Sequence, residues 1–367
     1  MNYIDTILFN ICCKLQLSDT LYKSATERYE AVASILGDAP FFKNTKIELY
    51  AQGSFRLKTT VKPLNRDEYD LDFVAQISAE SNLSPWDIYY GIYNILKHDG
   101  IHNGMVELKK RCIRINYAND FHLDIMPGKL IGNISSEIKV PDKENQTIYH
   151  HSNPKAYSEW FEKQAREVIV REMKSKFYAD SDIEHIQSQQ DVSYLEPLRR
   201  AVQLVKRYRD IYCDTYDKEP VRSIVLCTLM GQLPSYWGDA FYILKTFCKY
   251  TNALIDKNGN KPFDIINPVV DENLTEKWYE GNNFQDFVDM MKNLERDLEA
   301  LSSFEINSDI NKLLKKMFGE TVTQEAICAY ADDITSLRNE GKLKVGRNGR
   351  LSESEGELIR KNTFYGE

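Results

Sequence analysis

The sequence predicts an α+β protein of two lobes, the first containing a β-sheet and the second built from helices. Segments between residues 47 and 125 alternate apolar and polar residues with the period of two that is typical of β-strands. Beyond about residue 190 the apolar residues repeat at helical spacing. A chain of 367 residues usually holds two or three domain-sized units. We therefore expect a first lobe over 1–190, a helical lobe over 191–340 and a tail over 341–367.

The first lobe is expected to alternate helices with strands. In chain order the predicted elements are helices over Tyr3–Gln16 and Ser18–Gly37, a strand over Ile47–Tyr50, a strand over Asp70–Val74, a helix over Ile88–His98, hairpin strands over Val106–Ile115 and Phe121–Ile125, and a helix from Pro154 to Val168. The start of the Ile88 helix is well marked, because Ser84 suits a helix cap and Pro85 suits the first turn.

The second lobe is predicted to contain five helices. They cover Leu198–Tyr208, Ser223–Leu233, Phe241–Leu254, Asn282–Leu301 and Ile306–Phe318. A polar segment over 181–193 is the expected crossing between the lobes. The first of these helices carries many basic residues, among them Arg199 and Arg207, and we expect most of them to be solvated.

Two acids share one face of the strand over Asp70–Val74. Successive strand side chains point to opposite faces, so Asp70 and Asp72 project together while Leu71 and Phe73 face the core. In the hairpin's second arm the same alternation puts Asp124 on the face opposite Leu123 and Ile125. The three acids are expected to meet.

Carboxylates crowded on an otherwise apolar strand repel one another unless cations neutralise them. Backbones two residues apart on a strand are about 6.6 Å apart, a span over which carboxylates can jointly hold two metal ions. Oxygen-only ligation favours Mg²⁺, or Mn²⁺ in its place, over zinc. The sequence therefore predicts a site for two divalent ions at Asp70, Asp72 and Asp124.

A glycine-serine turn lies just upstream of these acids. Gly53 permits a tight bend after a short strand, and Ser54 is expected to cap a short helix near Phe55. Backbone N–H groups at a helix start favour anions. Gln52, Gly53 and Ser54 are thus candidate phosphate-binding residues, and together with the acids they predict a nucleotidyltransferase active site.

The same residues resemble the polymerase-beta-like nucleotidyltransferase superfamily, and longer stretches resemble one branch of it, the bacterial CD-NTases. The stretches that carry the resemblance lie between about residues 50 and 275 and cover 53–63, 68–72, 151–161 and 267–274. The fifteen residues between the Gly-Ser pair and Asp70 are more than the generic superfamily spacing but suit this branch.

This resemblance implies a mixed-sheet catalytic lobe followed by a helical C-terminal lobe. It also implies an enzyme that joins ribonucleoside triphosphates into cyclic di- or trinucleotides in anti-phage CBASS defence, with a separate effector receiving the product. Lys206 resembles the lysine that related enzymes place on the terminal phosphates. Ser223 resembles their phosphate-contacting serine at the start of the next helix.

Charge and composition exclude some classes of protein. With 47 basic and 55 acidic residues the net charge is −8, so no strong nucleic-acid binding is expected. The seven cysteines are scattered and contain no Cys-x-x-Cys, which fits reduced thiols. No apolar run approaches the length of a membrane span, so we expect no membrane partner and a cytoplasmic location.

Two alternatives stay open at this stage. One is a transferase of the same chemistry that labels RNA ends or a protein hydroxyl. The other is a non-catalytic nucleotide-binding platform, which the three intact acids disfavour because crowded carboxylates are destabilising. The sequence leaves open the bases chosen, the linkage, the ring size, the switch that activates the protein and any regulatory protein partner.

Overall fold

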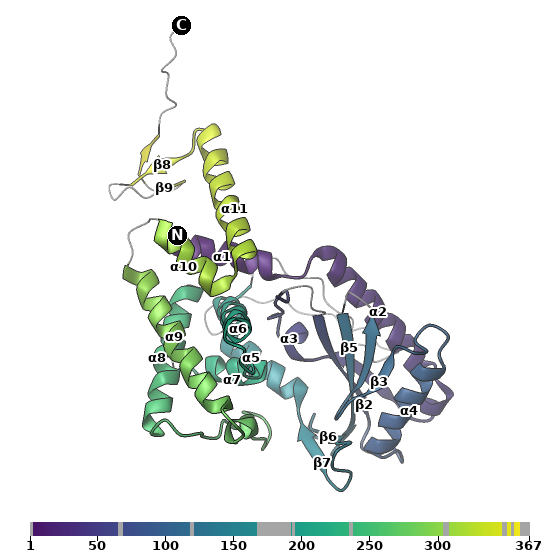
Figure 1. The fold of residues 1–367 in the computed structure, drawn as a ribbon. Helices are drawn as coiled ribbons and strands as arrows, with labels where there is room; N and C mark the ends of the chain where they lie inside the picture. The colour runs from purple at the N-terminus through teal and green to yellow at the C-terminus, as the bar shows by residue number, and fades with distance from the viewer. Residues whose placement is uncertain are drawn as a thin grey trace.

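The structure is a computed structural model that describes residues 3–64, 69–117, 121–166, 192, 195–234, 238–303, 308–346, 351–353 and 356–359. A sheet with its covering helices lies on one side of the molecule, and a group of helices lies on the other (Figure 1). The α+β class predicted from the sequence is confirmed. Among these residues no helix is both long and apolar enough to cross a membrane.

The larger sheet has seven strands and is mixed. They are β1 (Ile47–Ala51), β2 (Tyr69–Ile77), β3 (Val106–Leu108), β4 (Ile113–Tyr117), β5 (Phe121–Leu130), β6 (Ile138–Pro141) and β7 (Tyr149–Ser152). The order is β1-β2-β5-β4-β3, with β6 pairing to β5 and β7 to β6. Only the β2–β5 pair among these strands is parallel. Because β2 and β5 pair, the two strands that carry the predicted acids are direct neighbours.

Two helices pack on one face of this sheet. They are α2 (Asp19–Gly37) and α4 (Pro85–His98), and α4 starts as predicted, with a capping box between Ser84 and Asp87. The apolar core beneath them takes side chains from both helices and from one face of β2 and β5, including Tyr29, Ile88, Leu71, Phe73 and Leu123. The acids of β2 therefore point away from this core, as the period of two requires.

The other helices form a second core around α6. Their bounds are α1 (Tyr3–Leu15), α5 (Pro154–Arg166), α6 (Pro197–Tyr216), α7 (Ser223–Gly231), α8 (Ala240–Lys257), α9 (Asn283–Ser303), α10 (Ser308–Phe318) and α11 (Glu320–Asn339). Helix α6 contacts α1, α5, α7, α8, α9 and α10. The five helices predicted for this lobe are present, and α11 was not predicted.

Helix α1 lies with this second group, whereas the sequence-based boundaries assigned it to the first lobe. Its apolar side chains, among them Ile7, Leu8 and Ile11, are fully buried in the core around α6. It packs against α6, α8 and α11. The reason is long-range complementarity between apolar faces, which sequence adjacency does not reveal. The predicted crossing over 181–193 lies almost entirely outside the described residues.

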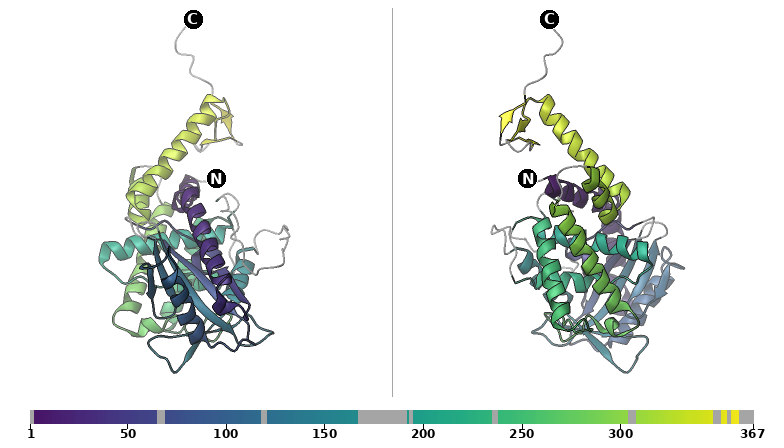
Figure 2. Two further views of the ribbon diagram at one scale, coloured as in Figure 1. Left: turned by 90° about the vertical axis from the view of Figure 1, so that its right-hand side faces the viewer. Right: turned by 60° about the vertical axis from the view of Figure 1, so that its left-hand side comes forward.

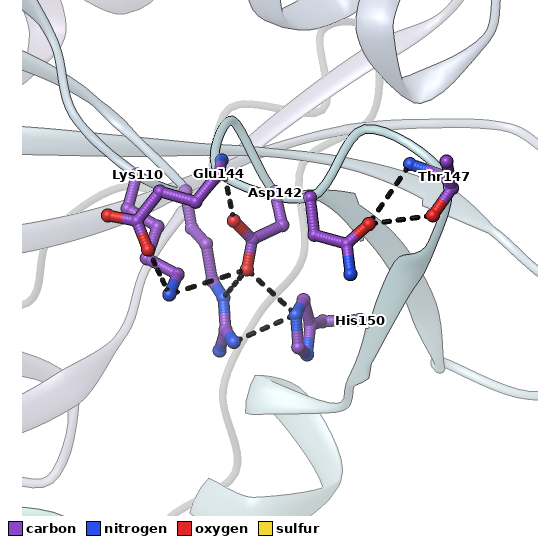
Figure 3. A network of polar contacts seen from close by, with 7 residues as sticks. Lys110, Asp142, Glu144, Thr147 and His150 are labelled. Carbon is purple, nitrogen blue, oxygen red and sulfur yellow. Dashed lines mark hydrogen bonds and ion pairs between the residues drawn. The ribbon is translucent and has the colours of Figure 1, made fainter.

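The expected single strand over Val106–Ile115 is two strands, β3 and β4, paired antiparallel across a turn at 109–112. Lys110 and Arg111 lie in this turn rather than on a strand face. Both contact Asp142, a buried carboxylate directly after β6, with Arg111 Nε at 3.2 Å and Lys110 Nζ at 3.8 Å. His150 of β7 adds a contact of 2.8 Å to the same carboxylate (Figure 3). This network ties the β3–β4 turn to the β6–β7 hairpin.

The C-terminal region forms an arm. The buried residues of α11 are Val322, Thr323 and Ala326, all near its start, where it packs on α1 and α10. Beyond them the helix projects from the body and ends at a small sheet of β8 (Lys344–Val345), β9 (Leu351–Ser352) and β10 (Glu357–Leu358) (Figure 2). The described part of the predicted tail over 341–367 thus contains the strands of this small sheet.

Candidate active site

A cleft of about 650 Å³ lies between the sheet and the helices around α6. Seven of the eight predicted site residues line it: Gln52, Gly53, Ser54, Asp70, Asp72, Lys206 and Ser223. The eighth, Asp124, adjoins the cleft without lining it. The structure therefore brings together residues from β2, β5, α6 and α7 with Gln52 and the first two residues of α3 (Gly53–Arg56).

The three acids come together through strand pairing. Asp70 and Asp72 alternate with buried Leu71 on β2, and Asp72 stands directly beside Asp124 in the parallel register of β2 and β5. The side chain of Asp70 is 62% exposed and that of Asp124 is 12% exposed. The register of β2 and β5 therefore brings the three acids together, as expected from the sequence.

Asp72 lies at the centre of this charge. Its pKa is raised from 3.8 to about 7, mainly by burial of the carboxyl and further by the negative charges of Asp124 and Asp70. Lys206 and Arg114 oppose the rise but do not cancel it. The group of acids thus carries more negative charge than its surroundings balance, and a cation beside Asp72 would relieve it.

The glycine at position 53 is required by this arrangement. Its φ is +61°, in the left-handed region, and a Cβ atom there would collide with Oδ2 of Asp72. The backbone N–H of Gln52 donates to the carbonyl of Asp72 at 2.8 Å, which fixes the turn against β2. The helix starts at Gly53 with Gln52 as its N-cap, so the prediction that Ser54 caps it was wrong.

Arg114 holds the third acid. It lies on β4, directly opposite Asp124 of β5. Its Nε donates to Oδ1 of Asp124 at 2.7 Å and its Nη2 donates to Oδ2 at 2.7 Å. The same Nη2 reaches Oδ1 of Asp70 at 3.3 Å. A role for Arg114 was not predicted from the sequence, although its place in an alternating strand opposite the Asp124 strand was a usable signal.

Three basic residues and one glutamine of α6 bind the backbone of residues 57–62, a segment we call the strap. The side-chain donors and the carbonyls that accept from them are Arg199 to Leu57, Lys206 to Thr59, Gln203 to Thr60 and Arg207 to Lys62. Each of the four donors is at most 6% exposed. The expectation of a mostly solvated basic face was therefore wrong for Arg199 and Arg207, because the strap covers them.

Lys206 and Ser223 lie on the helical side of the cleft. Burial lowers the pKa of the Lys206 amine, whose Nζ donates to the Thr59 carbonyl at 2.9 Å. Ser223 is the first residue of α7, and its Oγ accepts from Nη1 of Arg209 at 2.9 Å. Both residues lie where a phosphate in the cleft could reach them.

A family model described as the Second Messenger Oligonucleotide or Dinucleotide Synthetase domain matches residues 2–165 of the chain. The chain is also 33% identical over 379 residues to a c-di-GMP synthase of Roseivirga ehrenbergii, covering 96% of this chain and 98% of the relative. The chain belongs to the CD-NTase family. It is therefore a nucleotidyltransferase, as the sequence predicted.

Two solved structures share the fold of this CD-NTase. CdnG of Bradyrhizobium diazoefficiens, in complex with GTP, gives a TM-score of 0.72 at 23% identity, covering 90% of this chain and all of that one. The cyclic AMP-GMP synthase DncV of Vibrio cholerae, in complex with nonhydrolyzable GTP, gives a TM-score of 0.59 at 15% identity. The match covers 87% of this chain and 89% of that one. These likenesses confirm the catalytic lobe with a mixed sheet and the helical lobe beside it.

The cleft of this CD-NTase also has polar lining residues that the sequence analysis did not assign. Among them are Arg56, Arg209, Asp210, Arg222, Asn267 and Glu272. Arg56 ends the short helix after the Gly-Ser turn, and its Nε donates to Oγ of Ser158 on α5 at 2.7 Å. Arg56, Asn267 and Glu272 fall within the stretches that carry the family resemblance, which was the available signal.

Asp70 and Asp72 fit a divalent cation in this CD-NTase. They are oxygen donors on one strand face, and burial together with repulsion from the neighbouring acids raises the pKa of Asp72. Yet the described residues contain no group of three His, Cys, Asp or Glu side chains already arranged to hold a metal ion. In this arrangement Arg114 engages both oxygens of Asp124.

Proposed function

We propose that this CD-NTase is a metal-dependent cyclic dinucleotide synthase that joins ribonucleoside triphosphates and releases pyrophosphate. The observation that carries the proposal is the position of Asp70 and Asp72 in one cleft with the Gly53 turn. Likeness along the whole chain to a c-di-GMP synthase supports guanine nucleotides as substrates and a ring of two nucleotides over a ring of three. The cleft volume, about 650 Å³, lies within the range of small-molecule sites.

In the proposed reaction a ribose hydroxyl oxygen forms a bond to the α-phosphorus of a triphosphate while the bond to pyrophosphate breaks. Two Mg²⁺ ions, or Mn²⁺ in their place, would neutralise phosphate charge and lower the pKa of the attacking hydroxyl. Asp70 and Asp72 would hold both ions, and Asp124 would complete one site and accept the hydroxyl proton. A second transfer on the reoriented linear product closes the ring.

The remaining residues bind the triphosphate. The backbone N–H of Gly53, the hydroxyl of Ser54 and the neighbouring Gln52 would hold the departing pyrophosphate, as their place beside Asp72 supports. Lys206 and Ser223 would contact the terminal phosphates from the helical side. Phosphates would thus be held between a turn of the sheet lobe and the side chains of α6 and α7.

The same proposal includes a role in anti-phage CBASS signalling, in which a separate effector protein receives the cyclic product in the cytoplasm. Its support is the resemblance of the stretches 53–63, 151–161 and 267–274 to the bacterial branch of the family. A regulatory protein partner remains compatible with this role.

The test is a product assay. The protein is incubated with all four ribonucleoside triphosphates and Mg²⁺ or Mn²⁺, treated with phosphatase and analysed by mass spectrometry. We expect pyrophosphate release and a phosphatase-resistant cyclic dinucleotide that contains guanine, lost when GTP is omitted. Protein without added metal is the control.

Two outcomes would contradict the proposal. Nucleotide binding without pyrophosphate release, under every metal condition, would favour the non-catalytic platform. Pyrophosphate release that depends on added RNA or protein, with label transferred to that acceptor, would favour a transferase that modifies macromolecules.

A further inference from the structure

The contact between Arg114 and Asp124 is built into the sheet. The two residues are cross-strand partners in the antiparallel register of β4 and β5, so their side chains leave the same face of the sheet side by side. The guanidinium meets the carboxylate edge to edge, with both N···O distances at 2.7 Å. Such bidentate pairs are the strongest geometry available to arginine and carboxylate. Asp124 is therefore neutralised by this chain's own cation.

This contact conflicts with metal binding by the same carboxylate. Both oxygens of Asp124 accept hydrogen bonds from Arg114, and a fixed positive charge next to them repels a second cation. The guanidinium also reaches Asp70 at 3.3 Å, so it influences two of the three acids. Asp72 has no such contact with Arg114 in the structure and keeps a raised pKa. A divalent ion that used all three acids would have to displace Arg114 in part.

Arg114 cannot release Asp124 by losing its proton, because a guanidinium stays charged in proteins. It can release it by rotation, since its side chain is 24% exposed and its third contact, Asp70, is 62% exposed. The guanidinium therefore lies at the solvent edge of the cluster. A triphosphate entering the cleft brings anionic oxygens that suit the same bidentate geometry.

We propose that Arg114 competes with the divalent metal for Asp124 and releases it when a nucleotide's phosphates are in the cleft. The inference rests on the proposed function and deepens it. Metal alone then binds weakly, because Arg114 already forms hydrogen bonds with both oxygens of Asp124. Metal together with nucleotide binds tightly, because the phosphates accept Arg114 and the freed carboxylate accepts the metal. Arg114 is thus a positioning residue that couples the two binding events.

A static role for Arg114 makes the opposite prediction. If the guanidinium only holds Asp124 in the orientation that a metal needs, removing it lowers metal affinity. If the guanidinium competes with the metal, removing it raises metal affinity in the absence of nucleotide. The sign of the change separates the two roles.

The experiment measures Mn²⁺ binding by titration calorimetry and by electron paramagnetic resonance, without turnover. Wild type, Arg114→Met and Arg114→Lys are compared with and without a nonhydrolyzable GTP analogue. For Arg114→Met without analogue we expect Mn²⁺ affinity at least about tenfold above wild type, in line with the 10–100-fold effect of groups around a metal site. The Mn²⁺ affinity of Arg114→Lys, whose amine can make only one weaker contact, should lie between those of wild type and Arg114→Met. The analogue should tighten Mn²⁺ binding in wild type and add little in Arg114→Met.

Arg111→Met is the matched control. Arg111 lies three residues away and also pairs with a buried aspartate, Asp142, but neither residue lines the cleft. Its variant should leave Mn²⁺ affinity unchanged. The double variant Arg114→Met with Asp124→Asn should not show the higher Mn²⁺ affinity of Arg114→Met, because that increase depends on the freed carboxylate.

Equal or weaker Mn²⁺ binding by folded Arg114→Met would overturn the inference. So would wild-type Mn²⁺ affinity that is the same with and without the analogue, a measurement that needs no variant. The product assay keeps the two proposals apart. Pyrophosphate release by wild type together with no gain in Arg114→Met rejects the competition alone, whereas no release and no Mn²⁺ binding rejects the proposed function.

Discussion

The acid cluster and the strap interface both bury charge beside the same cleft, but they balance it in different ways. On β2 and β5 two of the three carboxylates, Asp70 and Asp124, contact one arginine, and Asp72 keeps a pKa of about 7. On α6 buried cations such as Arg199, Lys206 and Arg207 donate to backbone carbonyls of the strap. The first region has unbalanced negative charge, whereas in the second region each of these buried cations donates to a backbone carbonyl.

The difference separates a site for chemistry from a structural contact. Crowded carboxylates weaken a fold unless a cation joins them, so their presence indicates a ligand. Buried arginines on carbonyls satisfy hydrogen bonds that the strap could not make within a regular element, so they indicate a joint between lobes. Lys206 belongs to both regions, because it holds the strap and also lines the cleft.

The largest expected effect comes from Asp72→Asn. The amide keeps the shape of the carboxylate but loses its charge, so pyrophosphate release should fall by about a thousandfold or more, on the scale of losing one preorganised charge-stabilising group. Circular dichroism should report a folded protein. Asp256→Asn, an exposed aspartate of α8, is the control and should keep wild-type activity. Activity within a few-fold of wild type in Asp72→Asn would remove this carboxylate from the mechanism.

The next effect concerns the pH dependence of stability in metal-free protein. The pKa of Asp72 is about 7 in the folded state and 3.8 as an unperturbed group, so between these values the folded state keeps a proton that the unfolded state loses. The free energy of unfolding should therefore fall as pH rises from about 4 to about 7, by up to about 4 kcal/mol at 1.36 kcal/mol per pKa unit. Asp72→Asn should lack this component.

Urea unfolding of wild type and Asp72→Asn across this pH range, with chelator present, measures the difference directly. The stability of the variant relative to wild type should increase towards pH 8. A difference that stays constant from pH 4 to pH 8 would show that Asp72 titrates normally. Added Mn²⁺ should remove most of the difference, because the metal favours the ionised carboxylate.

The smallest of the three effects tests the strap. Arg207 donates to the carbonyls of Lys62 and Phe318, so Arg207→Met leaves both acceptors, one of them buried, without this donor. We expect unfolding to require about 2–3 kcal/mol less free energy, the range for lost hydrogen bonds to a charged group. Arg338→Met, an exposed arginine of α11, should change stability by less than about 0.5 kcal/mol. Wild-type stability in Arg207→Met would show that the hydrogen bonds of Arg207 to the strap and to Phe318 do not stabilise the fold.

Much of the site could be predicted because its signals are local. The alternation around Asp70 and Asp72 predicted their shared face, and Gly53 predicted a tight turn. The helix starting after Ser84 was predicted from its cap and proline. The contact of Arg114 with Asp124 was missed, because it depends on which strands pair and in what register. The strap was missed because its donors lie more than 140 residues away from their acceptors.

Residue type and spacing alone determined the α+β class, the face on which the strand acids lie and the glycine at the bend, since each follows from the geometry of a few consecutive residues. Only the tertiary structure decided that α1 joins the helical group, that α6 holds the strap and that Arg114 neutralises the third acid. These arrangements depend on pairing between distant segments, where complementary apolar faces and unpaired polar groups select one partner among many. For that reason the sequence indicated where metal and phosphate would bind, and the folded chain showed which of its own groups already occupies part of that site.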